Sequence, residues 1–374
     1  MITMERRLLA GDDSPFAQPT ATQLVALLRE AGLTGRGGAG FPAWRKLEAV
    51  ADAGRPPVVV GNGAEGEPLS GKDRALLTYQ PQLVLDGLRI VARALGATAT
   101  HLYVHPALRA LTVGIPMTVA PDAFVAGEES AVVNALAGRA PVPSDKRIRI
   151  TQAGLGGAPT LVQNVETLAH IALIVRHGPQ WFRSAGTPDE PGTFLATVGG
   201  AVAAPGVVEA GYGVRLGDLV DAAGGPVQPV QAVLVGGYHG GWVPAWPELP
   251  VSRAALGAYG SSPGAGVVLA LPSSACGLAE TASIAGCLAG QVAGQCGPCV
   301  NGLPRIATTL ADLAARRARP GLVDEVTRLS ALVQGRGACR HPDGTVRLVR
   351  SAMRAFAADV TAHLHGECLA GGAR

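Results

Sequence analysis

Short apolar runs alternate with helix-like segments through the first half of the chain. A run at Val58–Val60 precedes a helical segment that Pro81 can begin and Gly96 can end. His101–Val104 forms the next apolar run, and Asn164 stands where it can cap a later helix. Strands that alternate with helices favour a mostly parallel sheet covered on both faces. We therefore predict an α/β, Rossmann-like domain whose ligands bind beyond the carboxyl ends of its strands.

A dense glycine cluster follows the first predicted helix. Residues Gly35–Pro42 read Gly-Arg-Gly-Gly-Ala-Gly-Phe-Pro, directly after a helical stretch that Gly32 can end. Glycines let backbone N–H groups approach a ligand closely because no Cβ intervenes. Arg36 can form a bidentate pair with a phosphate, and Lys46 can add a second positive contact. Taken alone, an ordinary turn is the simpler explanation, because the chain has 51 glycines.

Two further segments place polar side chains at predicted strand or helix ends. Asn62, Glu65 and Glu67 follow the Val58–Val60 run, and Lys72–Arg74 come next. Amide and carboxylate groups there can bind a heteroaromatic ring or ribose hydroxyls. A polar loop with internal salt bridges explains them equally well. Glu128–Glu129 at a helix start can bind a ribose, although the helix dipole alone favours carboxylates at that position.

The pattern of predicted secondary structure changes after about residue 190. Short β-like runs such as Phe194–Val198 and Val233–Val235 are separated by glycine turns, which indicates a small β-rich module. From Cys276 onward the apolar spacing is helical again, and the last predicted helix carries Val349, Met353, Phe356 and Val360. We predict domains at residues 1–190, 191–270 and 271–374, the last a helical bundle.

The cysteines are gathered at one end of the chain. They are Cys276, Cys287, Cys296, Cys299, Cys339 and Cys368. A secreted disulfide scaffold would spread its cysteines through a short chain, whereas a metal or cluster domain gathers them. The Cys296-Gly-Pro-Cys299 spacing, with Cys339 beyond it, suits one iron–sulfur cluster or one zinc ion. A thioredoxin-like role is disfavoured because the motif is not at the edge of a βαβ unit.

Charge and hydropathy exclude other classes. The net charge is +3 and no basic cluster interleaves with aromatic residues, which argues against nucleic-acid binding. The first residues lack the apolar core of a signal peptide. The uncharged stretch near Ala254–Leu278 is interrupted by glycines and prolines, so it does not predict a membrane span. We expect a cytoplasmic protein, at most peripheral to a membrane complex.

Several motifs, in one order, carry a family resemblance. They are Gly35–Pro42, Asn62–Arg74, Gly127–Ser130, Pro159–Thr167 and Cys296–Cys299. Together they resemble the NADH-oxidising flavoprotein subunit of respiratory complex I and of NAD-linked hydrogenases. The middle module, with Gly200–Gly206 and Leu216–Leu219, is similar to the SLBB β-grasp fold. The resemblance implies an FMN domain over residues 1–190, the β-grasp module over 191–270 and a helical iron–sulfur domain over 271–374.

The resemblance also implies site residues and an activity. The FMN contacts would be Gly35, Arg36, Gly37, Gly38, Lys46, Asn62, Glu65, Gly127 and Asn164. The NADH contacts would be Phe41, Glu67, Glu129 and Lys146, and the cluster ligands Cys296, Cys299 and Cys339. In the family, hydride passes from NAD(P)H to FMN and electrons leave through the cluster to a partner, which would be a thioredoxin-like iron–sulfur subunit or a ferredoxin. No side chain is expected to act as a catalytic base.

The sequence departs from the family pattern at four positions. Ala64 replaces an aspartate, and Ala49 and Arg149 stand where aromatic residues help to hold the dinucleotide. Losing an aromatic stacking partner removes about 0.5–1.5 kcal/mol beyond area burial. Arg149 can meet the 2′-phosphate of NADPH, although a salt-bridged surface arginine is the simpler reading.

The cluster motif is the fourth departure. Ala293 stands at the first cysteine position, and Cys287 lies about 13 Å up the same predicted helix from Cys296. His341 is a candidate fourth ligand. The open readings are a [4Fe–4S] cluster with an unusual ligand, a [3Fe–4S] cluster and a Cys₃His zinc site, and we favour a cluster. An alternative function is an electron-transfer or assembly subunit that has lost NADH oxidation.

Overall fold

The computed structural model describes residues 6–145 and 147–370 and divides into two compact units. The first unit comprises the chain through Gly66, residues 70–196 and residues 207–214. The second comprises residues 67–69, 197–206 and 215 onward. The finer division at residues 190 and 270 remains a prediction.

The first unit holds a four-stranded sheet in the order β3-β2-β1-β4, and its registered pairs are all parallel. Its strands are β1 (Val58–Gly63), β2 (Ala99–Val104), β3 (Met117–Val119) and β4 (Thr160–Asn164). Its helices are α1 (Ala21–Ala31), α2 (Ala43–Ala51), α3 (Lys72–Tyr79), α4 (Pro81–Ala94), α5 (Glu129–Leu136), α6 (Val165–His177) and α7 (Pro179–Arg183). The predicted α/β class with a mostly parallel sheet is confirmed.

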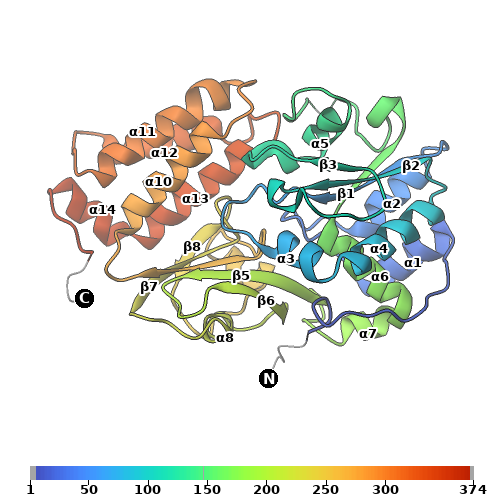
Figure 1. Cartoon of the computed structure of the whole chain (residues 1–374). Helices are drawn as coiled ribbons and strands as arrows, with labels where there is room; N and C mark the ends of the chain where they lie inside the picture. Colours follow the sequence, from blue (N-terminus) through green and yellow to red (C-terminus); the bar gives the residue numbers. More distant parts are fainter. Residues whose placement is uncertain (1–5, 146, 371–374) are drawn as a thin grey trace. The chain divides into compact units, whose positions relative to one another are not determined.

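Alternate residues of this sheet enter two different cores. Val59 and Leu161 pack in the core that also holds buried residues of α1, α4 and α6. Val58, Val60 and Val162 belong to a second core with residues of α5, on the opposite face (Figure 1). Successive side chains of a strand point to opposite faces, so apolar residues at consecutive positions require cover on both sides.

Helix ends in the first unit follow the signals in the sequence. Thr20 forms a capping box with Gln23 at the start of α1, and Gly32 ends that helix with φ 70°. Pro81 is the first residue of α4. Where α4 crosses α6, a Cβ on Gly87 would lie 1.9 Å from the Leu168 carbonyl oxygen, so only glycine permits this close approach.

The second unit combines most of a mixed sheet with a helical bundle. The sheet order is β6-β5-β9-β7-β8, with β5 parallel to β9 and β7 antiparallel to both β8 and β9. The strands are β5 (Thr193–Gly200), β6 (Gly206–Gly211), β7 (Val230–Val235), β8 (Gly241–Pro244) and β9 (Val267–Pro272), and β5 and β6 supply residues to both units. The helices are α8 (Leu216–Ala222), α9 (Arg253–Gly257), α10 (Gly277–Gly290), α11 (Leu303–Ala314), α12 (Leu322–Val333), α13 (His341–Ala355) and α14 (Ala357–Leu364).

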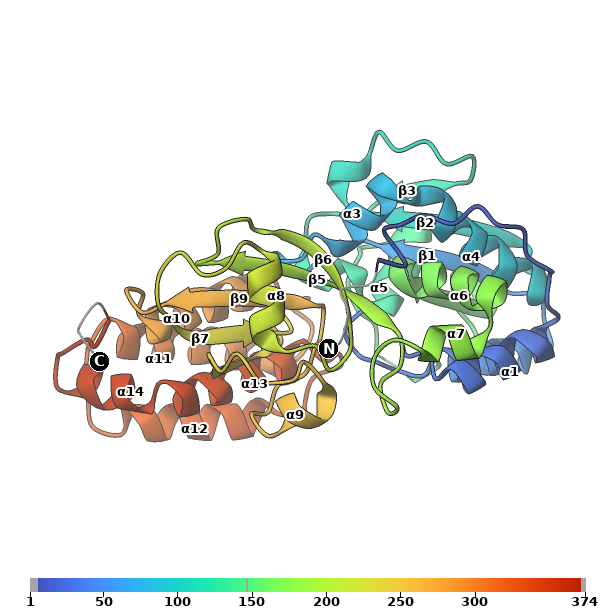
Figure 2. The ribbon, with the colours of Figure 1, turned by 90° about the horizontal axis from the view of Figure 1, so that it is seen from below.

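Trp242 of β8 joins the sheet to the bundle inside the second unit. Its backbone N–H donates to Ser351 Oγ of α13, and its indole N–H donates to Thr281 Oγ1 of α10, each at 2.9 Å. Its ring meets Phe356 edge-on at 5.3 Å. Helices α11, α12 and α13 lie side by side, with α14 following α13 (Figure 2).

The prediction of one last helix through residues 349–360 is wrong. The chain leaves helical geometry at Phe356, with φ −113° and ψ 33°, so α13 ends and α14 begins there. The apolar spacing continues across this break, and spacing alone therefore did not reveal it. The Phe356 ring packs against Gly277, where a Cβ would lie 2.3 Å from ring carbons.

Across the described residues, no helix has both the length and the apolar character needed to cross a membrane.

Candidate functional site

The glycine cluster forms a tight double turn between α1 and α2. Thr34 and Pro42 form an isolated antiparallel bridge, and the Gly35 N–H donates to the Phe41 carbonyl at 2.8 Å. Gly38 and Gly40 adopt φ values of 101° and 63°, a region that side chains with a Cβ disfavour. These two glycines are therefore explained by the turn itself.

Gly37 and Gly127 are not explained by the turn or by their neighbours. Neither has a positive φ among the described backbone angles. A Cβ on Gly37 would make ordinary contact with Asn164 Cβ at 3.4 Å, and one on Gly127 would meet Ala64 Cβ at 3.5 Å. The protein itself would thus accept alanine at both positions. Bare backbone there leaves space for a bound molecule to come close, as the predicted FMN cradle requires.

Asn62 and Asn164 connect this loop to the strand ends. They are register partners at the carboxyl ends of β1 and β4. The Asn62 side chain donates to the Gly127 carbonyl at 2.9 Å and accepts from the Ala64 N–H at 3.2 Å. Gly127 ends the short η2 helix (Phe124–Gly127) before α5. Residues that are far apart in sequence thus meet at the sheet edge where the sequence predicts a ligand site.

Lys46 and Glu129 form a pair in the same unit. Lys46 Nζ lies 2.9 Å from Glu129 Oε2 and donates to the Val162 carbonyl of β4 at 3.0 Å. Both side chains keep partial exposure, at 25% and 32%. Lys46 was predicted to contact FMN and Glu129 to contact NADH, and here they lie in contact with each other.

The Arg36 side chain is buried and turned inward. Its guanidinium donates to Thr34 Oγ1 at 2.8 Å and to the Pro191 carbonyl at 3.3 Å, and it lies over the Tyr212 ring at 4.7 Å. Its backbone N–H donates to Thr167 Oγ1 at 2.9 Å. These contacts hold the glycine loop in place, and they occupy the guanidinium that the sequence offered to a phosphate.

The Glu65 carboxylate forms hydrogen bonds with the loop that precedes α3 and with the start of that helix. Its carboxylate accepts from the backbone N–H groups of Asp73 at 2.8 Å and Arg74 at 3.1 Å, and from Ser70 Oγ at 2.9 Å. It also pairs with Arg74 Nε at 3.1 Å. Glu65 has a positive φ of 47°, which is uncommon outside glycine. The internal salt-bridge reading of this loop therefore describes the Glu65 side chain.

A buried charged network lies behind Asn164. Lys72 Nζ lies 2.5 Å from Asp73 Oδ1 and 2.9 Å from Glu166 Oε2. The Asn164 amide donates to Asp73 Oδ2 at 2.8 Å. Burial raises the pKa of Asp73 to about 6, although the Lys72 ammonium opposes this shift. Sequence reasoning missed Glu166; its one signal was its position in the Pro159–Thr167 motif, with no role attached.

The residues predicted to contact NADH lie in different parts of the structure. Phe41 is 48% exposed and can offer a ring face to a ligand. Glu67 belongs to the second unit, where it accepts from the Tyr238 N–H at 2.8 Å. Lys146 lies outside the described residues. Within the first unit, the structure therefore brings together Glu129 and Lys46.

Glu67 has an unusual acidity. Burial raises the pKa of Glu67 from 4.5 to about 7, while hydrogen bonds from Tyr238 and Leu69 oppose this shift. A raised folded-state pKa contributes stability below about 4.5 that is lost as the pH rises through about 7. Glu67→Gln should therefore gain stability relative to the native chain as the pH rises from 5 to 8. Melting temperatures of both chains across this range check this, and a constant difference would contradict it.

The structure shows the surroundings of the residues that depart from the family pattern. Ala64 is buried in the apolar core of Val58 and Tyr103, so an aspartate is replaced here by a core residue. Ala49 and Arg149 are exposed. Arg149 lines a hollow of about 140 Å³ together with Glu129. Arg149 and Glu129 thus contribute opposite charges to the lining of one hollow.

The second unit holds the predicted cluster cysteines. Cys296 Sγ and Cys299 Sγ lie 3.6 Å apart, where the chain enters a π-helical turn, η4 (Pro298–Gly302). Burial, followed by the neighbouring thiols of Cys296 and Cys339, raises the pKa of Cys299 to about 11. Cys339 lies near enough to influence the Cys299 thiol, and ligand binding to these thiols would have to displace their protons.

His341 does not offer a free ring nitrogen to these cysteines. Its Nε2 lies 2.8 Å from the Leu288 carbonyl, and its Nδ1 lies 3.1 Å from His239 Nε2. A Cys₃His zinc site would have to break this arrangement.

Comparisons with known proteins agree with this geometry. Residues 28–173 match the family model described as the Nuo51 FMN-binding domain, and residues 279–363 match the NADH-ubiquinone oxidoreductase-F iron-sulfur binding region. An NADH-quinone oxidoreductase subunit of Rhizobium meliloti is 31% identical over 92% of this chain and 89% of its own length. The chain belongs to this family of NADH-oxidising flavoprotein subunits. An NADH-quinone oxidoreductase subunit of Streptomyces coelicolor is 28% identical over 92% of this chain and 83% of its own.

A solved structure extends the family likeness to the whole fold. The NAD⁺-reducing [NiFe]-hydrogenase in the H₂-reduced state matches with a TM-score of 0.87 and 31% identity, covering 96% of this chain and 67% of that one. The chain is thus an oxidoreductase of the NADH dehydrogenase type, with an FMN-binding domain and an iron–sulfur binding region. The glycine cluster, the two asparagines and the Lys46–Glu129 pair all lie within the FMN-binding match. The resemblance read from the sequence is confirmed, and the individual contact residues remain predictions.

Proposed function

We propose that this chain binds FMN against the bare backbone of Gly37 and Gly127 and oxidises NADH there. When bound, FMN supplies the hydride acceptor and the conversion from two-electron to one-electron transfer. Gly37 and Gly127 carry the proposal, because neither backbone strain nor a protein neighbour accounts for glycine at either position. Adding FMN to the full chain should quench flavin fluorescence at one FMN per chain. Unchanged fluorescence would contradict the proposal.

The proposed FMN site consists of glycines that would contact the flavin, here called the walls, and side chains that hold the loops in place, here called the frame. Gly35, Gly37, Gly38 and Gly127 form the walls, and Asn62 and Asn164 fix the strand ends to which the loops attach. Arg36 and Glu65 act on the frame, since both side chains are already committed to protein partners. The rigid frame limits the conformational entropy that the loops would lose when a ligand binds.

The nicotinamide nucleotide is assigned to the exposed side of the same unit. Phe41 offers an accessible ring for stacking, and Glu129 offers a carboxylate for ribose hydroxyls. Lys46 neutralises Glu129 when no nucleotide is present, so binding would exchange one partner of this carboxylate for another. Lys146 is the remaining proposed NADH contact. The hydride step needs no proton transfer from a side chain.

Electrons are proposed to leave through an iron–sulfur cluster held by Cys296, Cys299 and Cys339. Two of these thiols are buried, and a buried cluster exchanges its ligands slowly with solvent. The relatives are subunits of larger redox assemblies, which supports a protein acceptor for this chain as well. The acceptor class we infer is a thioredoxin-like iron–sulfur subunit or a ferredoxin, in an assembly that can be peripheral to a membrane.

Ala293 gives a direct test of the cluster assignment. Ala293→Cys should supply a fourth thiolate three residues before Cys296, the spacing that the family uses. The native chain should then show the paramagnetic resonance signal of an oxidised three-iron cluster, and the variant should lose that signal and gain about one iron per chain. Iron and sulfide analysis with resonance spectra measures this. A matched change at Ala289, near the end of α10, should have no effect, and equal iron in all three chains would contradict a three-iron cluster at these cysteines.

A further inference from the structure

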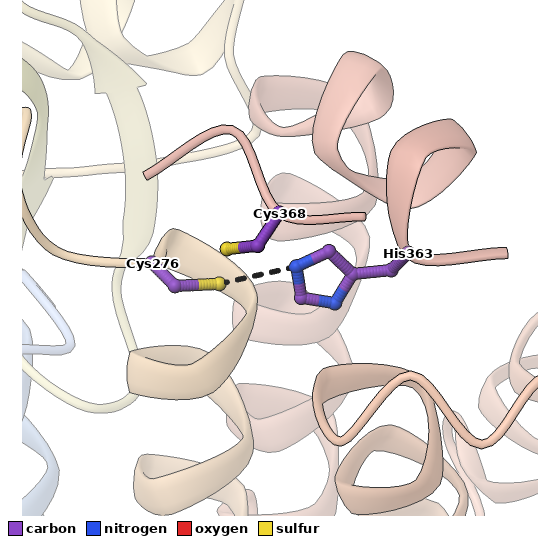
Figure 3. Close-up of side chains that lie close together, drawn as sticks. All are labelled: Cys276, His363 and Cys368. Carbon is purple, nitrogen blue, oxygen red and sulfur yellow. Dashed lines mark hydrogen bonds between the residues drawn. The ribbon is translucent and has the colours of Figure 1, made fainter. Parts of the chain in front are cut away.

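A second group of metal-binding side chains lies apart from the proposed cluster ligands. Cys276, His363 and Cys368 bring two sulfur atoms and one ring nitrogen within 4.8 Å of one another (Figure 3). Among residues 6–145 and 147–370, no other set of three cysteine, histidine or acidic residues converges this closely. Cys276 and Cys368 also lie outside the matched iron–sulfur region, residues 279–363. The family match therefore gives no reason for their convergence.

The distances suit a single ion. Cys276 Sγ lies 3.5 Å from His363 Nε2. In a tetrahedral zinc site, bonds of about 2.3 Å to sulfur and 2.0–2.1 Å to nitrogen place those two ligand atoms about 3.6 Å apart. The donor atoms thus already stand at nearly the separation that a shared zinc ion would impose.

The histidine is oriented as a metal ligand. His363 is 1% exposed, and its Nδ1 lies 3.0 Å from the Leu313 carbonyl of α11. Since a carbonyl only accepts, Nδ1 carries the proton and Nε2 presents its lone pair toward Cys276. Metal-binding histidines usually donate their other ring N–H to a carbonyl or carboxylate in this way, which fixes the tautomer and the ring.

The two cysteines are placed by opposite ends of helices. Cys276 is the N-cap of α10, and its sulfur accepts from the Ala279 N–H at 3.4 Å. After α14 the chain turns at Gly366, whose φ is 83°, and this turn returns Cys368 to the group. Cys368 is exposed, whereas Cys276 is half-buried. Two thiolates would balance the charge of a divalent ion, so the site would be neutral.

We propose that Cys276, His363 and Cys368 bind one zinc ion, which fastens the segment after α14 to the start of α10. Zinc suits two thiolates and one imidazole, and with three protein ligands a water molecule takes the fourth position. Zinc binding releases the two thiol protons to solvent, and no electron is transferred. The zinc site is distinct from the cluster proposed at Cys296, Cys299 and Cys339.

The test is metal retention by the full chain after cluster assembly. The chain is incubated anaerobically with zinc chloride and freed of loose metal, and zinc, iron and sulfide are then measured. The native chain should keep one zinc per chain. Cys368→Ser should lose it while iron and sulfide stay unchanged, and Cys287→Ser, a matched half-buried thiol on α10, should keep it.

Two further readouts separate the proposal from its alternatives. Cobalt in place of zinc should give a thiolate-to-cobalt charge-transfer band in the native chain and in Cys287→Ser, but not in Cys368→Ser. Zinc should also protect Cys276 and Cys368 from alkylation. Equal zinc in the native chain and Cys368→Ser would overturn the proposal. So would a preparation that retains no zinc and instead contains a Cys276–Cys368 disulfide.

Discussion

Replacing Gly37 with alanine should weaken FMN binding by about tenfold or more, equivalent to about 1.4 kcal/mol. The added Cβ would only touch Asn164 at 3.4 Å, so the FMN-free chain should keep its stability within about 0.5 kcal/mol. The loss would come from the methyl group entering space that the flavin occupies. Fluorescence titration gives the dissociation constant, and urea unfolding gives the stability.

Two companion variants sharpen this result. Gly127→Ala should behave as Gly37→Ala does, because its Cβ also meets only ordinary contact, with Ala64 at 3.5 Å. Gly257→Ala is the matched control, since a Cβ there meets nothing within 4 Å and the residue lies outside the first unit. Native affinity in both Gly37→Ala and Gly127→Ala would show that the flavin lies elsewhere.

Lys72→Met should destabilise the first unit by about 3–5 kcal/mol, because breaking a buried ion pair leaves an uncompensated charge. Lys72 is 3% exposed and faces both Asp73 and Glu166. Methionine fills a similar volume but carries no charge, so two carboxylates would remain buried together. Urea unfolding followed by far-ultraviolet circular dichroism measures the loss.

An exposed pair provides the comparison. Arg29 and Glu48 lie 2.8 Å apart with side chains 53% and 41% exposed, so Arg29→Met should cost less than about 1 kcal/mol. The Lys72→Met loss should also shrink as the pH falls toward about 6, because Asp73 without the Lys72 ammonium takes up a proton at a higher pH than in the native chain and so removes one of the unpaired charges. Similar losses in both variants, or no pH dependence, would show that Lys72 is not the counter-ion of this network.

Local signals predicted the sheet and the helix ends well. Gly32 and Pro81 stop and start helices by their own backbone geometry, and this needs no distant partner. The apolar runs at Val58–Val60 and His101–Val104 were expected to be strands and form β1 and β2, whereas β4 was not predicted. The loops that follow these strands meet at one sheet edge, as that topology demands.

The sequence did not predict in which direction individual side chains point. Arg36 turns toward Pro191 and Tyr212, partners more than 150 positions away, and nothing local marks that choice. His341 is held by Leu288 and His239, which removes it from the cluster ligands that the sequence suggested. These outcomes depend on tertiary packing, which residue spacing does not encode.

Residue spacing also gave no indication of the group formed by Cys276, His363 and Cys368. Cys276 is separated in sequence from His363 and Cys368 by most of the helical bundle, so no short sequence motif contains all three residues. The turn at Gly366 and the carbonyl of Leu313 complete its geometry, and each becomes visible only once the helices are packed.

Anaerobic titration of the FMN-loaded chain with NADH tests the central claim most directly. We predict that the flavin absorbance bleaches as NADH is added, in stoichiometric amounts, and that Gly37→Ala under the same FMN concentration bleaches in proportion to the flavin it still binds. A chain that binds FMN, is bleached by dithionite and yet keeps its full absorbance in excess NADH would contradict the account.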